Sequence, residues 1–171
     1  MPLRFRVREG ELADLGVIEE MLEAALNWDP SAPRRSLAEL YAVDATVRRY
    51  LAEWGRAGDA SVIAVASSGY CIGAAWFRLF SAEQPGYGFV DASTPELSIA
   101  VARPYRGRGV GSALLAALLA AAAERGHPRL SLSVAIGNPA QQLYRRHGFV
   151  DVATRKADLL MVAPTAVVGA R

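Results

Sequence analysis

One segment of this 171-residue chain limits its fold more than any other. The run RPYRGRGVGSALLAALL, residues 103–119, holds three glycines and three arginines within nine residues and then continues into leucines and alanines. Just before it, Leu97, Ile99 and Val101 alternate with smaller or polar residues, as in a strand with two different faces. The sequence therefore predicts a strand, a glycine-rich turn and a long apolar helix that begins near Gly109.

The start of such a helix attracts anions. The first four N–H groups of a helix have no partners inside it, and its aligned peptide dipoles leave about half a positive charge there. Glycine lets the backbone approach a ligand closely, so the amides of residues 108–111 can surround a phosphate, with arginines at the rim. Alternatively, the glycines make only a tight turn and the arginines are solvated. The glycine spacing alone does not decide between these readings.

Two other phosphate-binding motifs do not fit this loop. A P-loop requires GxxxxGK followed by Ser or Thr, and the loop contains no lysine. A dinucleotide fingerprint follows a first strand and is itself followed, about 20 residues later, by an acidic residue. Here the glycine run falls late in the chain, and the next strand ends without such a residue. We therefore expect neither of these nucleotide folds.

The rest of the chain alternates between helical and strand-like periodicity. In chain order we expect a strand at 3–8, helices at 11–28 and 36–55, a hairpin of 61–65 and 70–80, a loop at 81–95, a strand at 96–102, the apolar helix up to Gly126, a strand at 130–136, a helix at 138–148, and a hairpin of 149–153 and 159–163. This order predicts one mixed α/β sheet with helices on its faces. We expect residues 1–171 to form a single domain.

Composition excludes several classes of protein. With 52% hydrophobic and 21% charged residues the chain is not mainly disordered, and a net charge of +2 does not indicate a nucleic-acid partner. The longest apolar run, residues 110–123, is shorter than the roughly 20 residues of a membrane span. Cys71 is the sole cysteine, neither histidine has a partner suggesting metal or triad chemistry, and we see no leader. We expect a cytoplasmic protein that binds no nucleic acid, membrane or metal.

The segment ELSIAVARPYRGRGVGSALL resembles the acetyl-CoA-binding segment of the GNAT superfamily of N-acetyltransferases. In that family a strand and a short turn lead into Q/RxxGxG/A at the start of a helix, and Arg106, Gly109 and Gly111 occupy the motif positions. A second segment, SVAIGNPAQQLYRRHGFV, is similar to the next strand and helix of the family through Asn138, Tyr144 and others. The resemblance is strong over residues 95–150 and weak before them.

The resemblance implies a mostly antiparallel central sheet in which one parallel pair of strands splays apart, with helices on both faces. The pantetheine arm of acetyl-CoA then enters the gap and pairs with the first of these strands, whose amides also polarise the thioester carbonyl. The pyrophosphate lies on the glycine-rich turn, and an arginine reaches the ribose phosphate. The implied cofactor-binding residues are Ile99, Ala100, Val101, Arg103, Arg106, Gly107, Arg108, Gly109, Val110, Gly111, Ser112 and Asn138.

The resemblance also implies two catalytic residues. An amine that attacks a thioester must lose a proton, and Glu96 is placed to accept it through water, with Ser98 on the same face. The alternative is that Glu96 is a solvated carboxylate at a strand end and Ser98 is merely small. Tyr144 matches the family's proton donor to the departing thiolate, and the alternative is a core tyrosine at helical spacing.

Three further candidates also have structural explanations. Asn138 can bond the pantetheine or cap the helix that follows it, because its spacing from Tyr144 differs by one residue from that of many relatives. Trp28 and Tyr41 come from segments that flank the acceptor groove in the family, and either can instead belong to the core.

We therefore predict an N-acetyltransferase, monomeric or homodimeric. It moves an acetyl group from acetyl-CoA to a primary amine of a small molecule or peptide. Direct attack in a ternary complex is expected, since no cysteine or serine is placed as an acyl carrier. Two alternatives remain: a non-catalytic acyl-CoA-binding or sensor domain on the same scaffold, and a phosphate-binding adaptor. No motif in the first helices or in residues 81–95 identifies the acceptor.

Overall fold

A computed structural model describes residues 3–166 of the chain, and residues 1–2 and 167–171 lie outside the described part. The described elements are β1 (Phe5–Glu9), the short turn η1 (Leu12–Asp14), α1 (Leu15–Leu26), α2 (Leu37–Val43), α3 (Ala45–Arg49), β2 (Ala60–Ala66), β3 (Cys71–Arg78), β4 (Glu96–Val101), the short turn η2 (Arg103–Tyr105), α4 (Val110–Glu124), β5 (Arg129–Ala135), α5 (Ala140–Arg146), β6 (Val150–Arg155) and β7 (Asp158–Pro164). The strands form one seven-stranded sheet in the order β1-β2-β3-β4-β5-β7-β6. The predicted mixed α/β sheet is confirmed.

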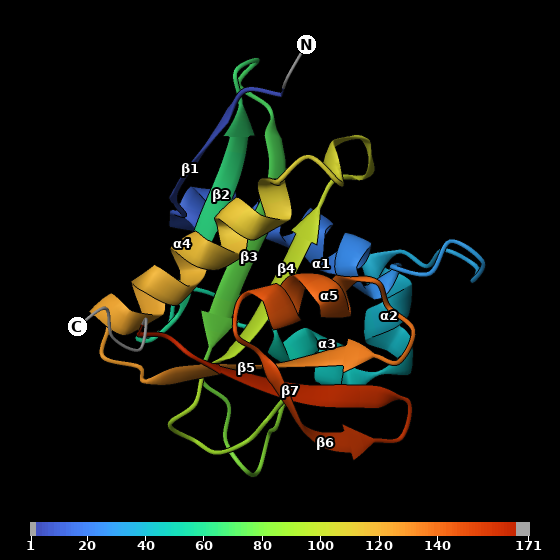
Figure 1. Ribbon diagram of the computed structural model, residues 1–171. Coiled ribbons are helices and arrows are strands. Elements are labelled where there is room, and N and C mark those ends of the chain that lie inside the picture. Colours follow the sequence, from blue (N-terminus) through green and yellow to red (C-terminus); the bar gives the residue numbers. More distant parts are fainter. Residues whose placement is uncertain (1–2, 167–171) are drawn as a thin grey trace.

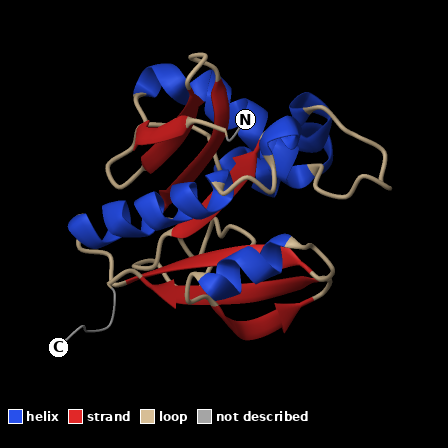
Figure 2. Ribbon diagram, turned by 45° about the horizontal axis from the view of Figure 1, so that its top comes forward, coloured by secondary structure: helices blue, strands red, loops and turns tan. Residues whose placement is uncertain are grey.

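The sheet is antiparallel except between its central strands. β4 and β5 run parallel and pair only at Glu96 and Ser131, whereas β5 and β7 pair along their whole length. Beyond that single point β4 and β5 move apart, as Figure 1 shows. Figure 2 shows the strands in two groups, with the long helix α4 running between them. The splayed parallel pair is therefore present.

The two faces of the sheet carry separate hydrophobic cores. On one face α4 and α5 pack on the sheet through residues such as Leu114, Leu118 and Tyr144. On the other face α1 packs on it, with Ile18 and Leu22 among the buried residues. This places helices on both faces. The predicted alternation in β4 is confirmed, because its odd-numbered residues belong to the α4 side and Ala100 belongs to the α1 side.

The predicted helix over residues 36–55 is wrong in one respect, because the chain forms two short helices. The break falls at Asp44, whose backbone is extended and whose side chain accepts a hydrogen bond from the Thr46 amide at 2.8 Å. Asp offers the backbone this local partner in place of a continued helix, and it thereby starts α3. The predicted capping box between Ser36 and Glu39 is confirmed at the start of α2. The break directs Tyr50, which follows α3, toward the centre of the sheet.

Candidate functional site

A cavity of about 790 Å³ opens where β4 and β5 diverge. All six residues of β4 line it. Because successive side chains of a strand point to opposite faces, a cavity that reaches all of them passes from one side of the sheet to the other. Its volume lies within the range of small-molecule and cofactor sites. It is therefore the candidate site, with one end toward α4 and the other toward α1.

The glycine-rich turn lies at the α4 end of the cavity. Gly107 and Gly109 have φ angles of +71° and +84°, and Gly109 caps the start of α4. A Cβ atom at either position would meet no atom within 4 Å, so the backbone conformation, not crowding, requires glycine there. At Gly111 the reason is crowding, because a Cβ atom would lie 3.2 Å from Leu143 of α5. The three glycines therefore shape the turn and bring α5 close to α4.

The structure brings most of the predicted cofactor-binding residues together. Those that line the cavity are Ile99, Ala100, Val101, Arg106, Gly107, Gly109, Gly111, Ser112 and Asn138. Val110 lies outside the lining, with its side chain in the core beneath α4. The exposed side chains of Arg103 and Arg108 also lie outside it. The roles given to these two arginines stay predictions.

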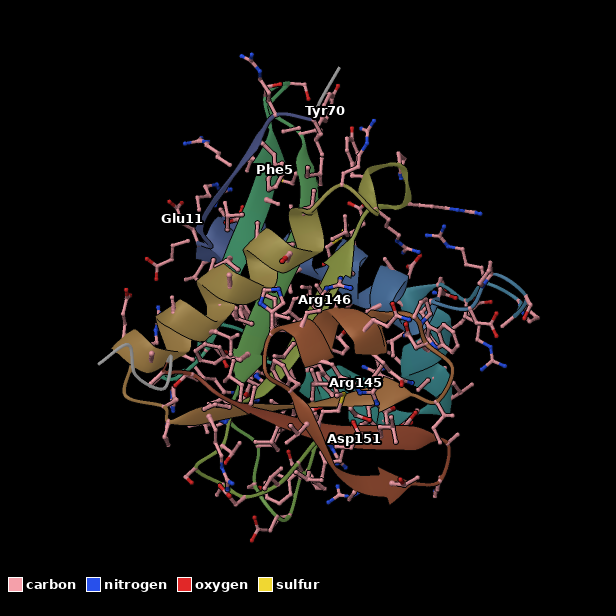
Figure 3. The ribbon with its side chains drawn as sticks, in the orientation of Figure 1. Phe5, Glu11, Tyr70, Arg145, Arg146 and Asp151 are labelled. Carbon is pink, nitrogen blue, oxygen red and sulfur yellow. The ribbon has the colours of Figure 1, made fainter. Side chains whose placement is uncertain are left out.

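One feature of the α4 end was not predicted from the sequence: a contact between α4 and the end of α5. Ser112 Oγ lies 2.7 Å from Nε2 of His147, at the end of α5. The sequence suggested no partner for His147, and its half-burial lowers the pKa of the imidazole. The neighbouring Arg146 lines the cavity from the same helix end (Figure 3). Arg106, predicted to bind phosphate, donates from Nε to the Val101 carbonyl at 2.9 Å.

The backbone of β4 offers amides to the cavity. The Ala102 amide donates to the carbonyl of Ile72 in β3 at 2.9 Å. In an antiparallel pair the backbone groups of every second residue point to the same neighbouring strand, so the even-numbered residues of β4 bond to β3. Ala100 is therefore turned toward β3, and the amides of Ile99 and Val101 point toward the gap. The side chain of Ala100 lines the cavity although its amide is turned toward β3, and its role in cofactor binding stays a prediction.

Glu96 lies inside the protein at the α1 end of the cavity. It is only 3% exposed, which rules out the solvated alternative. Its Oε1 accepts a hydrogen bond from the Tyr50 hydroxyl, and Oε2 has no partner within residues 3–166. Burial raises the pKa of Glu96 to about 7, against the opposing effects of the Tyr50 hydrogen bond, the Gly88 backbone and the charge of Arg155. This carboxylate can therefore accept a proton near neutral pH.

The loop over residues 81–95 closes over this carboxylate. A Cβ atom on Gly86 would lie 2.2 Å from Oε2 of Glu96, and one on Gly88 would lie 2.7 Å from the backbone of β5. The Tyr87 amide, between these glycines, donates to the Tyr50 hydroxyl at 2.8 Å. The sequence shows no motif in this loop. Its two glycines, Gly86 and Gly88, are the one feature that could have marked it, because a larger residue at either position would leave no room for Glu96 or β5.

Tyr144 lies at the α4 end of the cavity. It is buried, and its ring meets Phe149 edge-on with centroids 5.9 Å apart. It also lines the cavity, so its core position does not remove it from the site. Burial raises the pKa of its phenol to about 12, and the hydroxyl therefore stays protonated at neutral pH.

The remaining candidates divide between the cavity and the helical layer. Asn138 Oδ1 accepts from the amide of Ala140, the first residue of α5, at 2.9 Å, and Asn138 also lines the cavity, so both of its predicted roles stay predictions. Trp28 and Ser98 line the α1 end. Tyr41 does not line the cavity, because its ring packs in the helical layer with the Arg48 guanidinium 5.1 Å from its centroid. Its predicted contact with substrate is not supported by this position.

The fold and the cavity define a class of protein. In this class a mixed sheet opens between two parallel strands, and a helix with a glycine-rich start lies at the opening. The model of the Acetyltransferase (GNAT) family matches residues 18–149. The chain belongs to this family, which confirms the resemblance. Within residues 3–166 no helix is long and apolar enough to cross a membrane. The same residues contain no group of three or more His, Cys, Asp or Glu side chains that could hold a metal ion.

Solved structures of the family share the whole fold. The GNAT domain of an S. lividans protein is 21% identical, with a TM-score of 0.67 over 96% of this chain and 94% of that one. A phosphinothricin acetyltransferase from Sinorhizobium meliloti, solved with acetyl-CoA, is 23% identical, with a TM-score of 0.64 over 96% and 89%. A ribosomal-protein-alanine N-acetyltransferase from Brucella melitensis is 26% identical, with a TM-score of 0.62 over 93% and 99%.

A curated relative matches over a shorter stretch. Mycothiol acetyltransferase from Clavibacter sepedonicus is 48% identical over 66 residues. The match spans 37% of this chain and 22% of the relative, so it covers about a fifth of that protein.

Proposed function

We propose that this protein is an N-acetyltransferase that transfers the acetyl group of acetyl-CoA directly to a primary amine, with both substrates bound at once. One observation carries the proposal: the buried carboxyl group of Glu96, with a pKa raised to about 7, belongs to the lining of a cavity that passes through the sheet. An amine can enter from the α1 end and acetyl-CoA from the α4 end, so that the two meet at β4.

The residues of the α4 end fit acetyl-CoA. The left-handed glycines and the first turn of α4 present amides suited to a pyrophosphate, and Arg106 and Arg146 add positive charge at the same end. Beyond Glu96, the edge of β4 that faces β5 has no strand partner within residues 3–166. The backbone of Ile99 and Val101 can therefore pair with the amides of the pantetheine arm. When bound, acetyl-CoA supplies the thioester whose acyl group is transferred.

Glu96 takes the proton that the amine loses. As the N–C bond forms and the C–S bond breaks, the amine nitrogen gives up one proton, and Glu96 accepts it through water. A carboxylate of ordinary pKa is a weak base at neutral pH, whereas burial raises the pKa of Glu96 to about 7. The Tyr50 hydrogen bond to Oε1 holds the carboxyl group in place, with Oε2 beside Gly86 of the loop over residues 81–95.

Tyr144 stabilises the sulfur that leaves with the C–S electron pair. Its phenol, with a pKa of about 12, is a weaker acid than an alkyl thiol, whose pKa is roughly 8.5. Full transfer of the proton to sulfur is therefore unfavourable, and the hydroxyl donates a hydrogen bond to the departing thiolate. For an amine that attacks as the free base, the proton balance closes with one proton on Glu96 and the thiolate released as an anion. An acceptor that arrives as an ammonium ion first releases one further proton to solvent.

Thiol release from acetyl-CoA, measured across a panel of amines, tests the proposal. We expect turnover with at least one amine, and we expect Tyr144→Phe to lower kcat while calorimetry shows unchanged acetyl-CoA affinity. Acetyl-CoA binding without turnover on any amine would instead support the sensor alternative. An unchanged kcat in Tyr144→Phe would remove the role of Tyr144 but leave the transfer itself in place.

A further inference from the structure

The two ends of the cavity carry opposite charge. At the α4 end the lining includes Arg106 and Arg146 beside the positive start of a helix. At the α1 end the charged lining residues are Glu96 and Asp158. The cavity is therefore basic where we place acetyl-CoA and acidic where we place the acceptor.

The strand register puts Asp158 on the same face of the sheet as Glu96. Asp158 lies opposite Ala135 in the pairing of β5 with β7, and directly opposite residues of an antiparallel pair share a face. In β5 the side chains of Leu132 and Val134 pack in the α4 core, so Ala135 points the other way. Asp158 therefore lies at the α1 end, where its half-buried side chain lines the cavity.

The negative charges at the α1 end of the cavity affect the pKa of Tyr87. Burial raises the pKa of its phenol most, the hydrogen bond to Asp44 raises it further, and the charges of Asp158 and Glu96 add to both effects. The Tyr87 hydroxyl donates to Asp44 at 2.5 Å, so that phenol is already engaged. The charge of Asp158 is then available to a ligand.

Asp158 takes part in none of the ion pairs found within residues 3–166. The nearest candidate by register is Arg155, which lies opposite it in the hairpin. Arg155 donates instead to the Phe89 carbonyl at 3.1 Å and so ties the 81–95 loop to β6. Glu96, the other carboxyl group that lines this end, likewise takes part in none of these ion pairs.

We propose that the acceptor is a dicationic amine, in which one amine is acetylated beside Glu96 and a second ammonium or guanidinium group binds Asp158. This inference rests on the proposed function. The part of the molecule between the two cations lies against the apolar wall formed by Ala25, Leu26 and Trp28. An acceptor with a carboxylate in place of the second cation is disfavoured, because Asp158 repels that group and the guanidinium of Arg155, opposite Asp158, is bonded to the Phe89 carbonyl.

Three series of acceptors with matched chain lengths test this inference: diaminoalkanes, alkylamines and ω-amino acids of three to six carbons. Thiol release is measured at pH 8, where Glu96, with its pKa of about 7, is mostly ionised. We expect kcat/KM to be highest for a diamine, about fivefold lower for the alkylamine of equal length, and lowest for the amino acid. Asp158→Asn should lower the diamine value to that of the alkylamine and change the alkylamine value less than twofold.

Asp151→Asn is the matched control, because it removes the same charge from the same hairpin. Asp151 lies opposite Met161 and so faces the α5 side, where it pairs with Arg145 at 3.0 Å (Figure 3). The diamine preference should survive in this variant. Equal values for diamine and alkylamine in the unaltered protein, or equal effects of the two variants, would overturn the inference while acetyl transfer stands. Absence of turnover on all three series, with acetyl-CoA bound, would overturn the proposed function and this inference together.

Discussion

The two ends of the cavity use different parts of the polypeptide. The α4 end is built mainly from backbone, with left-handed glycines, the first turn of α4 and the unpaired edge of β4. The α1 end is built from buried side chains, with the Tyr50 hydroxyl hydrogen-bonded to Glu96. The loop over these two residues has no room for a Cβ atom at Gly86 or Gly88. Backbone amides do not titrate, whereas a buried carboxylate does. Changes to the backbone of the α4 end should alter acetyl-CoA affinity, and changes to Glu96 and Tyr50 at the α1 end should alter rate and pH dependence.

The largest effect is expected for Glu96→Gln. The amide cannot accept the amine proton, and a positioned general base contributes roughly 100- to 10,000-fold. Steady-state thiol release should show kcat/KM falling by at least about 100-fold. Acetyl-CoA affinity, measured by calorimetry, should change less than twofold because the α4 end is untouched. Equal losses of rate and affinity would show that the two ends are not separable.

The pH dependence of kcat/KM tests the role of Glu96 as a base in a second way. Glu96 must be ionised to act as a base, and its pKa is about 7, so kcat/KM should rise with pH and level off above about 7. In Glu96→Gln this ascending limb should disappear from the residual activity. A limb that persists near neutral pH in the variant belongs to another group.

Gly109→Ala tests the backbone end. A side chain at a φ of +84° is strained, at a cost of roughly 1–2 kcal/mol, and the turn must shift the amides that receive the pyrophosphate. We expect acetyl-CoA affinity to fall about tenfold, with kcat at saturating acetyl-CoA nearly unchanged. Gly16→Ala is the control, since Gly16 lies in α1 with open space around it and no left-handed backbone. That variant should bind normally, and similar losses in both would contradict the assignment of the anion site.

The raised pKa of Glu96 also predicts how stability depends on pH. The unfolded chain ionises this carboxyl near 4.5, whereas the folded protein does so at about 7, so stability falls as pH rises between these values. The difference costs on the order of 3 kcal/mol above pH 7. Glu96→Gln removes this dependence, so its Tm relative to the unaltered protein should be higher at pH 8 than at pH 4 by roughly 5 to 10 °C. A pH-independent Tm difference would mean that Glu96 ionises normally in the folded state.

The contrast between the two ends also explains what sequence analysis could find. The turn at the α4 end comes from one contiguous stretch of sequence. The local spacing of Arg106, Gly109 and Gly111 is therefore enough to predict it. Tyr50 and Glu96 are 46 residues apart, and only tertiary packing brings them together. The alternation of β4 placed Glu96 on the correct face, but it could not show that the loop over residues 81–95 covers the carboxyl group of Glu96.

Two other discrepancies have the same origin. Asp158 could not be placed before the pairing of β5 with β7 was known, because only that register puts its side chain on the face of Glu96. Tyr41 lies in a helix whose periodicity gave no sign of the break at Asp44. Local patterns therefore predict elements and turns, whereas the acceptor end depends on how those elements meet.

The smallest effect, and the most specific, is expected for Tyr50→Phe. The Tyr50 hydrogen bond lowers the pKa of Glu96, so its loss should raise that pKa and move the ascending limb of the kcat/KM profile to higher pH. Activity at pH 6.5 should fall several-fold and recover by pH 9, whereas acetyl-CoA affinity stays the same. Tyr41→Phe makes the same change outside the cavity and should leave the profile in place. A uniform loss of rate at every pH in Tyr50→Phe would mean that Tyr50 fixes the position of Glu96 without tuning its ionisation, and the side-chain end would then act by geometry alone.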